Sequence, residues 1–213
     1  FHSLESVHVM SEIEKLSFAD RAKHLGDPDF YKVPEKLLID SLYLLERISK
    51  INMDSSLLSS NIYAGKFNLK ESEETTHFSI VDKYGNASSL TTTLNGSFGS
   101  GIIVDGAGFL LNNEMDDFSI QPGYPNMYGL VGGEANSVEP SKRMLSSMTP
   151  TILEKDGNLF MVLGTPGGST IITAVFQTII NIIDFDMNIE QAVNSPRFHH
   201  QWYPDEIKLE KDI

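Results

Sequence analysis

The chain has 213 residues with an ordinary globular composition, 40% hydrophobic and 21% charged, which excludes collagen-like and fully disordered proteins. Its formal net charge of −13 argues against binding to a nucleic-acid backbone, because such binding requires a basic face. No apolar run is long enough to cross a bilayer, and the absence of cysteine excludes disulfides and cysteine nucleophiles.

The first fifty residues are predicted to be helical. Apolar residues recur at near-helical spacing from Leu4 to Phe18, and the pattern ends at Gly26-Asp27-Pro28. A second helix is predicted to begin at Pro34, a good first-turn residue, and to continue to Ile48. Because the chain begins within a helical pattern and without a leader, we expect it to be a fragment of a longer protein.

After a stretch rich in serine and glutamate, which we expect to be a flexible loop (residues 51–74), the apolar period changes from helical to two. The later part of the chain is predicted to contain two hairpins and a helix, with a Gly- and Pro-rich loop at Pro122–Gly133. The expected strands are Thr75–Val81 with Ala87–Leu94 and Thr151–Lys155 with Leu159–Gly164, and the helix runs from about Thr170 to Ile183.

The first hairpin can be given a register. If its turn centres on Tyr84, the numbers of paired residues sum to about 168, and Thr75 lies opposite Thr93. Asn95 is two residues further along and is expected on the same face of the sheet. Two hydroxyls and an amide are therefore predicted to gather at one end of a sheet, although a run of threonines also reflects simple strand propensity.

Gly167-Gly168 lies between the last expected strand and the helix that follows. Amide N–H groups at such a turn are unpaired and face the positive end of the helix dipole, so they stabilise a carboxylate, a phosphate or a developing oxyanion. A close-packed glycine pair is the alternative. A phosphate-binding P-loop is excluded, because no Gly-Lys-Ser/Thr follows.

Two further polar groups have open interpretations. The acids of Glu114-Met115-Asp116-Asp117 are either a solvated face, half of a metal site or a partner for a substrate ammonium, but their spacing is not that of a calcium loop. Ser146-Ser147 is either an ordinary loop or a pair of hydroxyl ligands.

Taken together, these motifs follow the order found in one enzyme family. They are Thr75–Ser79, Leu111–Phe118, Gly129–Gly133, Leu145–Met148, Pro166–Ser169 and Pro196–Trp202. The sequence strongly resembles the γ-glutamyltranspeptidases, especially the bacterial members. The resemblance implies an α+β fold, the four-layered αββα sandwich of N-terminal-nucleophile hydrolases, incomplete in this fragment. Residues 1–74 correspond to the end of the large subunit, and 75–213 to most of the small subunit.

The resemblance also implies that the precursor cuts itself between Glu74 and Thr75. A threonine hydroxyl is a weak nucleophile without a neighbouring base, and the α-amine released by the cut has a pKa near neutrality that suits this role. The family uses no cofactor. The matching positions imply that Thr93 orients the Thr75 hydroxyl and that Gly167 and Gly168 form the oxyanion hole.

The remaining family roles concern the γ-glutamyl substrate. The implied ligands of its α-ammonium are Asn95, Glu114 and Asp117, those of its α-carboxylate are Ser146 and Ser147, and Tyr128 matches a lid over the pocket. The family's carboxylate-binding arginine belongs to the rest of the large subunit, which is therefore an expected partner, and the last strands of the small subunit are also expected to be missing. His199 and His200 suggest a metal site, but adjacent strand residues point to opposite faces, so we expect a structural role and no metal.

This sequence departs from the bacterial pattern at three positions, without losing a catalytic group. Met144 replaces a usual proline, Thr170 replaces an arginine, and Glu114 stands where many relatives have glutamine. The implied activity is γ-glutamyl transfer from glutathione and similar donors to water or amino acceptors. The alternatives are a related acylase, a poly-γ-glutamate transferase, or a catalytically silent remnant that only binds γ-glutamyl compounds. Bacterial relatives suggest a periplasmic or secreted location.

Overall fold

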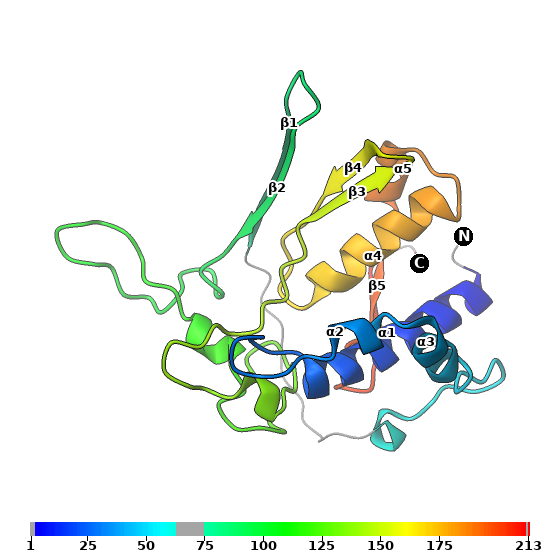
Figure 1. The fold of residues 1–213 in the computed structure, drawn as a ribbon, viewed down its shortest axis with the longest axis horizontal. Coiled ribbons are helices and arrows are strands. Elements are labelled where there is room, and N and C mark those ends of the chain that lie inside the picture. The colour runs from blue at the N-terminus through cyan, green and yellow to red at the C-terminus, as the bar shows by residue number, and fades with distance from the viewer. Residues whose placement is uncertain (1–2, 63–74, 212) are drawn as a thin grey trace. The chain divides into compact units, whose positions relative to one another are not determined.

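The computed structural model describes residues 3–62, 75–211 and 213 and combines helices with short antiparallel strands (Figure 1), which confirms the α+β class. No helix among these residues is long and apolar enough to cross a membrane. The helices are α1 Leu4–His24, α2 Glu35–Leu38, α3 Ser41–Ile48, α4 Thr170–Ile183 and α5 Ile189–Asn194, with short 3₁₀ turns at Ser59–Asn61, Glu114–Asp117 and Glu134–Asn136. The strands are β1 Thr76–Val81, β2 Ala87–Thr92, β3 Thr151–Lys155, β4 Asn158–Leu163, β5 Phe198–His199 and β6 Lys208–Leu209.

The chain divides into two compact units. Unit 1 comprises Phe1–Lys70, Met115–Leu145 and Ser195–Ile213, and unit 2 comprises Glu71–Glu114 and Ser146–Asn194. The sequence analysis places a boundary before Thr75, where a cut in the chain would divide it between two subunits. The compact units follow a different division, since unit 1 draws residues from both sides of Thr75. Each unit is described below by itself.

Unit 1 is built around α1. The Ser3 side chain caps the helix by accepting a hydrogen bond from the Ser6 amide, and Arg21, Lys23 and His24 occupy the last turn, where a positive charge favours the helix dipole. The buried apolar side chains of the unit come from α1, from the segment after the acidic motif and from the chain near its C-terminal end. They are Met10, Leu16, Phe18, Ala19, Ala22, Phe118, Tyr128, Leu130, Val131, Ala135, Phe198, Trp202 and Tyr203.

The prediction of one continuous helix from Pro34 to Ile48 is wrong. The chain forms α2 and α3 instead, separated at Asp40. The Asp40 side chain accepts hydrogen bonds from the amides of Leu42 and Tyr43 at 2.9 and 3.2 Å, which starts a new helix. An aspartate in this position competes with helical continuation by capping the next turn, and the apolar periodicity did not reveal this effect.

His200 is a buried histidine of unit 1 whose protonation state follows from its contacts. Its Nδ1 accepts a hydrogen bond from the Trp202 amide at 3.0 Å, so the neutral ring carries its proton on Nε2, which lies 3.4 Å from Asp205 Oδ1. Burial and the nearby positive charge of Lys15 lower the pKa of His200 to about 4, although Asp205 acts in the opposite direction. A second proton would have to occupy Nδ1 and would break the bond to Trp202.

We therefore expect unit 1 to lose stability as the pH falls from about 6.5 to 4. The pKa of His200 in the folded protein lies below the ordinary value of 6.5, so the unfolded chain binds more protons between pH 4 and 6.5. The stabilisation that neutral His200 contributes is therefore complete only above about pH 6.5. The contribution of this group changes by at most about 1.4 kcal/mol per pH unit. Urea unfolding followed by Trp202 fluorescence measures it, with His200→Asn as a non-titrating control. The same pH dependence in both proteins would refute the assignment.

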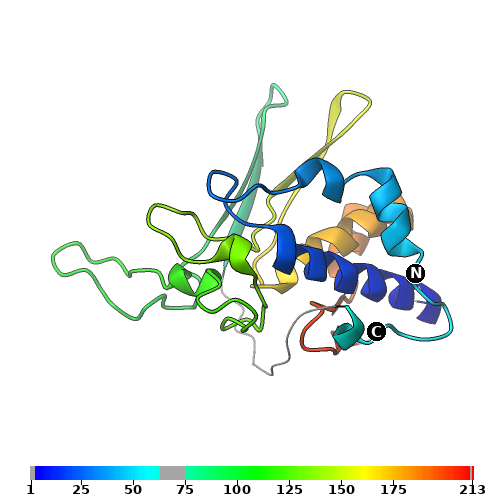
Figure 2. The same cartoon turned by 60° about the horizontal axis from the view of Figure 1, so that its bottom comes forward.

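Unit 2 contains two hairpins and α4. Thr76 pairs with Thr92 and Val81 with Ala87, so paired numbers sum to 168 and the predicted register of the first hairpin is confirmed. The second hairpin, β3 with β4, has an irregularity between Leu153 and Glu154. The two hairpins form separate two-stranded sheets and diverge toward their turns (Figure 2).

The hairpins touch where β4 ends, shortly before the glycine turn. The Ser89 hydroxyl of β2 donates to the Leu163 carbonyl of β4 at 3.0 Å. Gly164 lies directly against the His77 ring of β1, where an added Cβ would be only 2.3 Å from the ring atoms. This close approach requires glycine and places the end of β4 beside the beginning of β1, from which the site is built.

Candidate active site

Thr75, Thr93 and Asn95 form a hydrogen-bonded group at the open end of the first hairpin. The Thr75 hydroxyl lies 3.4 Å from Thr93 Oγ1, and the Asn95 amide donates to Thr93 Oγ1 at 2.9 Å. The predicted meeting of Thr75 with Thr93 is confirmed. Asn95 was predicted to join them through its side-chain amide, but the bond to Thr93 comes from its main-chain N–H, and its side chain donates to the Asn113 carbonyl instead. Strand β2 ends at Thr92, and Asn95 is placed by a turn in which its φ is +72°, not by alternation along a strand.

Asn113 holds this turn in place and was given no role by the sequence analysis. Its amide donates to the Leu94 carbonyl at 3.1 Å, and its side-chain oxygen accepts from the Gly96 amide at 2.9 Å. Its carbonyl accepts from Asn95 Nδ2 at 3.4 Å. These contacts bring the segment that carries Glu114 against the residues that follow β2. A second asparagine beside the acidic motif was the only signal in the sequence.

An open cavity of about 270 Å³ borders the threonine pair. Its lining residues all come from the two ends of the first hairpin and the turn beyond it, namely Thr75, Thr76, Thr92, Thr93, Leu94, Gly96 and Ser97. The Thr75 hydroxyl therefore borders a space that admits a small molecule while a second hydroxyl fixes its direction. This arrangement is suited to a nucleophile.

The Gly167-Gly168 turn precedes α4, as predicted. Gly167 has φ +139° and Gly168 has φ +55°, conformations that favour glycine. The carbonyl of Gly167 accepts from the amide and the hydroxyl of Thr170, which fixes the turn. Neither glycine amide donates to an acceptor within residues 3–62 and 75–211, so both donors are suited to a developing oxyanion.

Glu114, Ser146 and Ser147 also belong to unit 2. Glu114 is half-buried, and burial raises the pKa of its carboxyl above the ordinary value. The Ser146 hydroxyl accepts a hydrogen bond from the Met148 amide at 3.0 Å, which leaves its proton available to a ligand, and Ser147 follows directly. Glu114, Ser146 and Ser147 thus lie in the same compact unit as Thr75.

Asp117 and Tyr128 belong to unit 1. Asp117 lines a small cavity of about 20 Å³ together with Arg21, and burial lowers the pKa of Arg21 to about 10 although the charge of Asp117 acts to raise it. Arg21 thus provides a cation beside the acid, a feature that no sequence motif revealed. Tyr128 is buried, and its carbonyl accepts from Gln201 Nε2 at 2.9 Å.

His199 and His200 have protein partners in unit 1. His199 Nε2 lies 2.8 Å from Gln201 Oε1, and its ring meets Phe18 edge-on. The described residues contain no group of three or more His, Asp or Glu side chains arranged to hold a metal ion.

The γ-glutamyltranspeptidase family model matches residues 1–213, the whole chain. The chain belongs to the γ-glutamyltranspeptidase family. It is 53% identical over 211 residues to the glutathione hydrolase proenzyme of Escherichia coli (strain K12), covering 99% of this chain and 36% of that protein. The chain thus spans about a third of the length of this relative and is homologous to glutathione hydrolase enzymes.

Solved structures agree with this assignment. A mutant of the Helicobacter pylori γ-glutamyltranspeptidase matches with a TM-score of 0.63 at 62% identity, over 64% of this chain and 73% of that one. The cephalosporin acylase of Bacillus halodurans matches with a TM-score of 0.75 at 25% identity, over 93% of this chain and 33% of that one. The fold described above is therefore one that γ-glutamyltranspeptidases and an acylase share over part of their chains.

Proposed function

We propose that this chain carries the nucleophile of an enzyme that transfers the γ-glutamyl group of glutathione and related donors to water or amino acceptors. The observation that supports it most directly is the Thr75 hydroxyl, hydrogen-bonded to Thr93 beside an open cavity in a member of this family. The complete enzyme has the αββα sandwich of N-terminal-nucleophile hydrolases and, like bacterial relatives, a periplasmic or secreted location.

The enzyme matures by a cut between Glu74 and Thr75, which yields residues 1–74 as the end of one subunit and 75–213 as most of the other. An internal Thr75 lacks a base, whereas the α-amine released by the cut accepts the hydroxyl proton. Mass spectrometry of the purified protein tests this step. Two pieces separated before Thr75 support the enzyme, and a single uncut chain supports a silent binding remnant.

In the proposed reaction, the Thr75 oxygen bonds to the γ-carbonyl carbon while the α-amine takes its proton. The amides of Gly167 and Gly168 stabilise the negative oxygen of the tetrahedral intermediate. Collapse breaks the bond from carbon to nitrogen, and the leaving amine receives the proton. Water or an acceptor amine then attacks the γ-glutamyl ester, which releases the product and restores the Thr75 hydroxyl.

The enzyme recognises the donor by the α-ammonium and the α-carboxylate at one end of the γ-glutamyl group. Asn95, Glu114 and Asp117 hold its α-ammonium. The hydroxyls of Ser146 and Ser147 donate to its α-carboxylate, together with an arginine from the rest of the large subunit, and Tyr128 covers the pocket. A carboxylate makes a charge-assisted hydrogen bond to an ammonium, so Asp117 favours donors that carry this group.

Replacing Asp117 with asparagine is expected to weaken γ-glutamyl donors far more than glutaryl analogues without the amine. Loss of a charge-assisted contact in a desolvated pocket costs about 1.5–3 kcal/mol, or roughly 10–150-fold in kcat/KM. Steady-state kinetics with both donor types on the complete enzyme measure the difference. Asp116→Asn is the matched control, because it removes the same charge one residue away. Equal losses for both donors would show that Asp117 does not recognise the amine.

A related acylase or poly-γ-glutamate transferase is the second candidate, and the similarity to the cephalosporin acylase structure favours the acylase among these. The two enzymes differ in the donor that they accept. An acylase would turn over amides that lack the α-ammonium at least as fast as γ-glutamyl amides, which is the opposite of the order expected from Asp117.

A further inference from the structure

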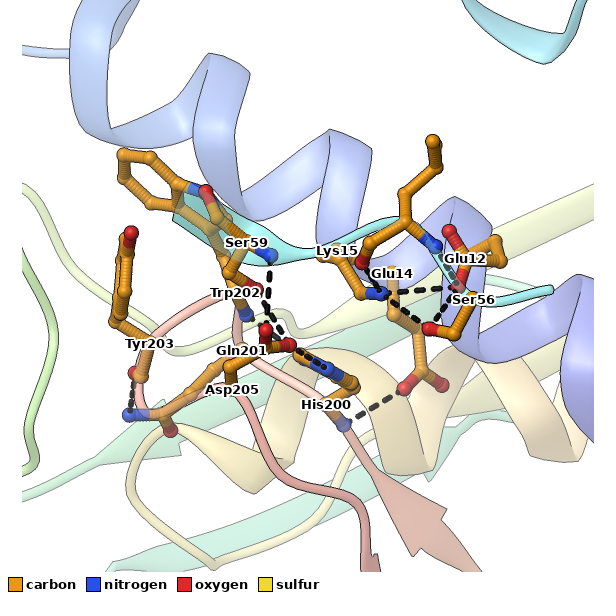
Figure 3. A network of polar contacts seen from close by, with 11 residues as sticks. Glu12, Glu14, Lys15, Ser56, Ser59, His200, Gln201, Trp202, Tyr203 and Asp205 are labelled. Carbon is orange, nitrogen blue, oxygen red and sulfur yellow. Dashed lines mark hydrogen bonds and ion pairs between the residues drawn. The ribbon is translucent and has the colours of Figure 1, made fainter. Parts of the chain in front are cut away.

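A network of polar contacts in unit 1 joins residues that precede Thr75 to residues that follow it (Figure 3). Its three parts are the middle of α1, the segment 56–59 and the segment 200–205. The first two would lie on the upstream piece after a cut before Thr75, and the third on the downstream piece. The contacts between them therefore cross the proposed division of the chain.

The upstream half of the network fixes segment 56–59 on α1. Lys15 Nζ donates to Glu12 Oε1 at 2.9 Å, to Ser56 Oγ at 3.0 Å and to the Leu57 carbonyl at 2.5 Å. The Ser56 hydroxyl and the Leu57 amide in turn donate to Glu12 Oε1 at 2.7 and 3.3 Å. Lys15 and Glu12 are each only 1% exposed, and buried charges persist when they are paired and hydrogen-bonded.

Ser59 gives its three polar groups to the downstream segment. Its amide and its hydroxyl donate to the two carboxylate oxygens of Asp205 at 2.9 and 2.7 Å, and its carbonyl accepts from Trp202 Nε1 at 3.2 Å. Ser59 and Trp202 are almost fully buried. Burial acts to raise the pKa of Asp205, but hydrogen bonds from Ser59 lower it overall, so the acceptor stays ionised.

Two more contacts cross between α1 and the downstream segment. The His200 amide donates to Glu14 Oε2 at 2.9 Å, and the His199 ring meets Phe18 edge-on. The buried Glu14 carboxylate thus receives a donor that belongs to the other piece. The upstream helix and the downstream segment satisfy one another's buried polar groups, as the two sides of a stable interface do.

We propose that the contact of Ser59 with Asp205 and Trp202 is a lock that holds the end of the upstream piece on the downstream piece after the chain is cut. The inference rests on the proposed cleavage before Thr75. Its partner surface is another part of the same chain, and its strength comes from charge-assisted hydrogen bonds that the buried Ser59 donates to the Asp205 carboxylate, together with the bond from the buried Trp202. Before the cut, the covalent link keeps the two sides together, so the lock becomes decisive only afterwards.

The test cuts the chain without relying on self-cleavage. A recognition sequence for a site-specific protease is placed between residues 63 and 74 of a chain that carries Thr75→Ala, and the two pieces are followed by native mass spectrometry on dilution. We expect the pieces to remain associated. Asp205→Ala should raise their dissociation constant by about tenfold or more, since it removes two charge-assisted bonds.

Glu206→Gln is the matched control, because it removes the charge of the neighbouring acid and leaves the bonds between Ser59 and Asp205 in place. This variant should leave the dissociation constant unchanged. Trp202 fluorescence of each uncut chain reports folding, and Asp205→Asn, which keeps one acceptor, replaces Asp205→Ala if that variant misfolds. The proposal would be overturned if the cut chain with Asp205→Ala and the cut chain that keeps Asp205 had equal dissociation constants. It would also be overturned if the two pieces of the chain that keeps Asp205 separated immediately. Failure of self-cleavage would instead overturn the proposed function. The dissociation assay would not detect that failure, because the added protease makes the cut.

Discussion

Replacing Thr75 with alanine is expected to abolish both self-cleavage and turnover of the complete enzyme. The same hydroxyl is the proposed nucleophile of both steps, and alanine offers no other group to attack a carbonyl. The structure places this hydroxyl 3.4 Å from Thr93 Oγ1, and Thr75 lines the cavity. A denaturing gel measures processing, and release of amine from a γ-glutamyl anilide measures turnover.

Two variants of the same hairpin separate loss of the nucleophile from damage to the strand. Thr75→Ser keeps the hydroxyl and should retain processing and part of the turnover. Thr76→Ala changes the next residue, which pairs with Thr92 in the sheet, and should be processed normally. Normal processing of the Thr75→Ala variant would show that another residue is the nucleophile.

The sequence predicted the local structure well wherever a short-range signal decides it. The turn around Tyr84 determines the register of the first hairpin, because residues on both strands are counted from the same point, and Thr76 pairs with Thr92 as expected. The break at Asp40 was missed, since apolar periodicity continues through it while a single side-chain cap interrupts the helix.

The positions of Thr75, Thr93 and the glycine turn were predictable from the sequence, but the contacts that hold the neighbouring segments in place were not. The threonines and the glycine turn lie where motif and register placed them. Asn113 and Arg21 act through contacts between segments far apart in the chain, the first on the turn that contains Asn95 and the second beside Asp117. Such contacts depend on tertiary packing, which a single sequence does not encode in its local pattern. The same holds for Ser59 and Asp205, which are 146 positions apart.

Replacing Gly167 with alanine is expected to lower kcat of the complete enzyme by about 10²–10³-fold, the usual loss when one oxyanion-hole donor is misplaced. Gly167 has φ +139°, which strains any residue with a side chain, and an added Cβ would lie 2.6 Å from Thr170 Oγ1. The turn would have to shift, and its amide would no longer point at the developing oxyanion. The KM for the donor should change much less, because the amide acts mainly on the transition state.

The matched control is Gly157→Ala in the turn between β3 and β4. This glycine also has a positive φ, +74°, but no atom lies within 4 Å of an added Cβ, so the substitution tests backbone strain without a clash and away from the proposed oxyanion. Adding Thr170→Ala to the Gly167→Ala variant should restore part of kcat by relieving the contact. If Gly167→Ala alone retains full kcat, the glycine turn only packs against α4, and the oxyanion must be stabilised by other donors.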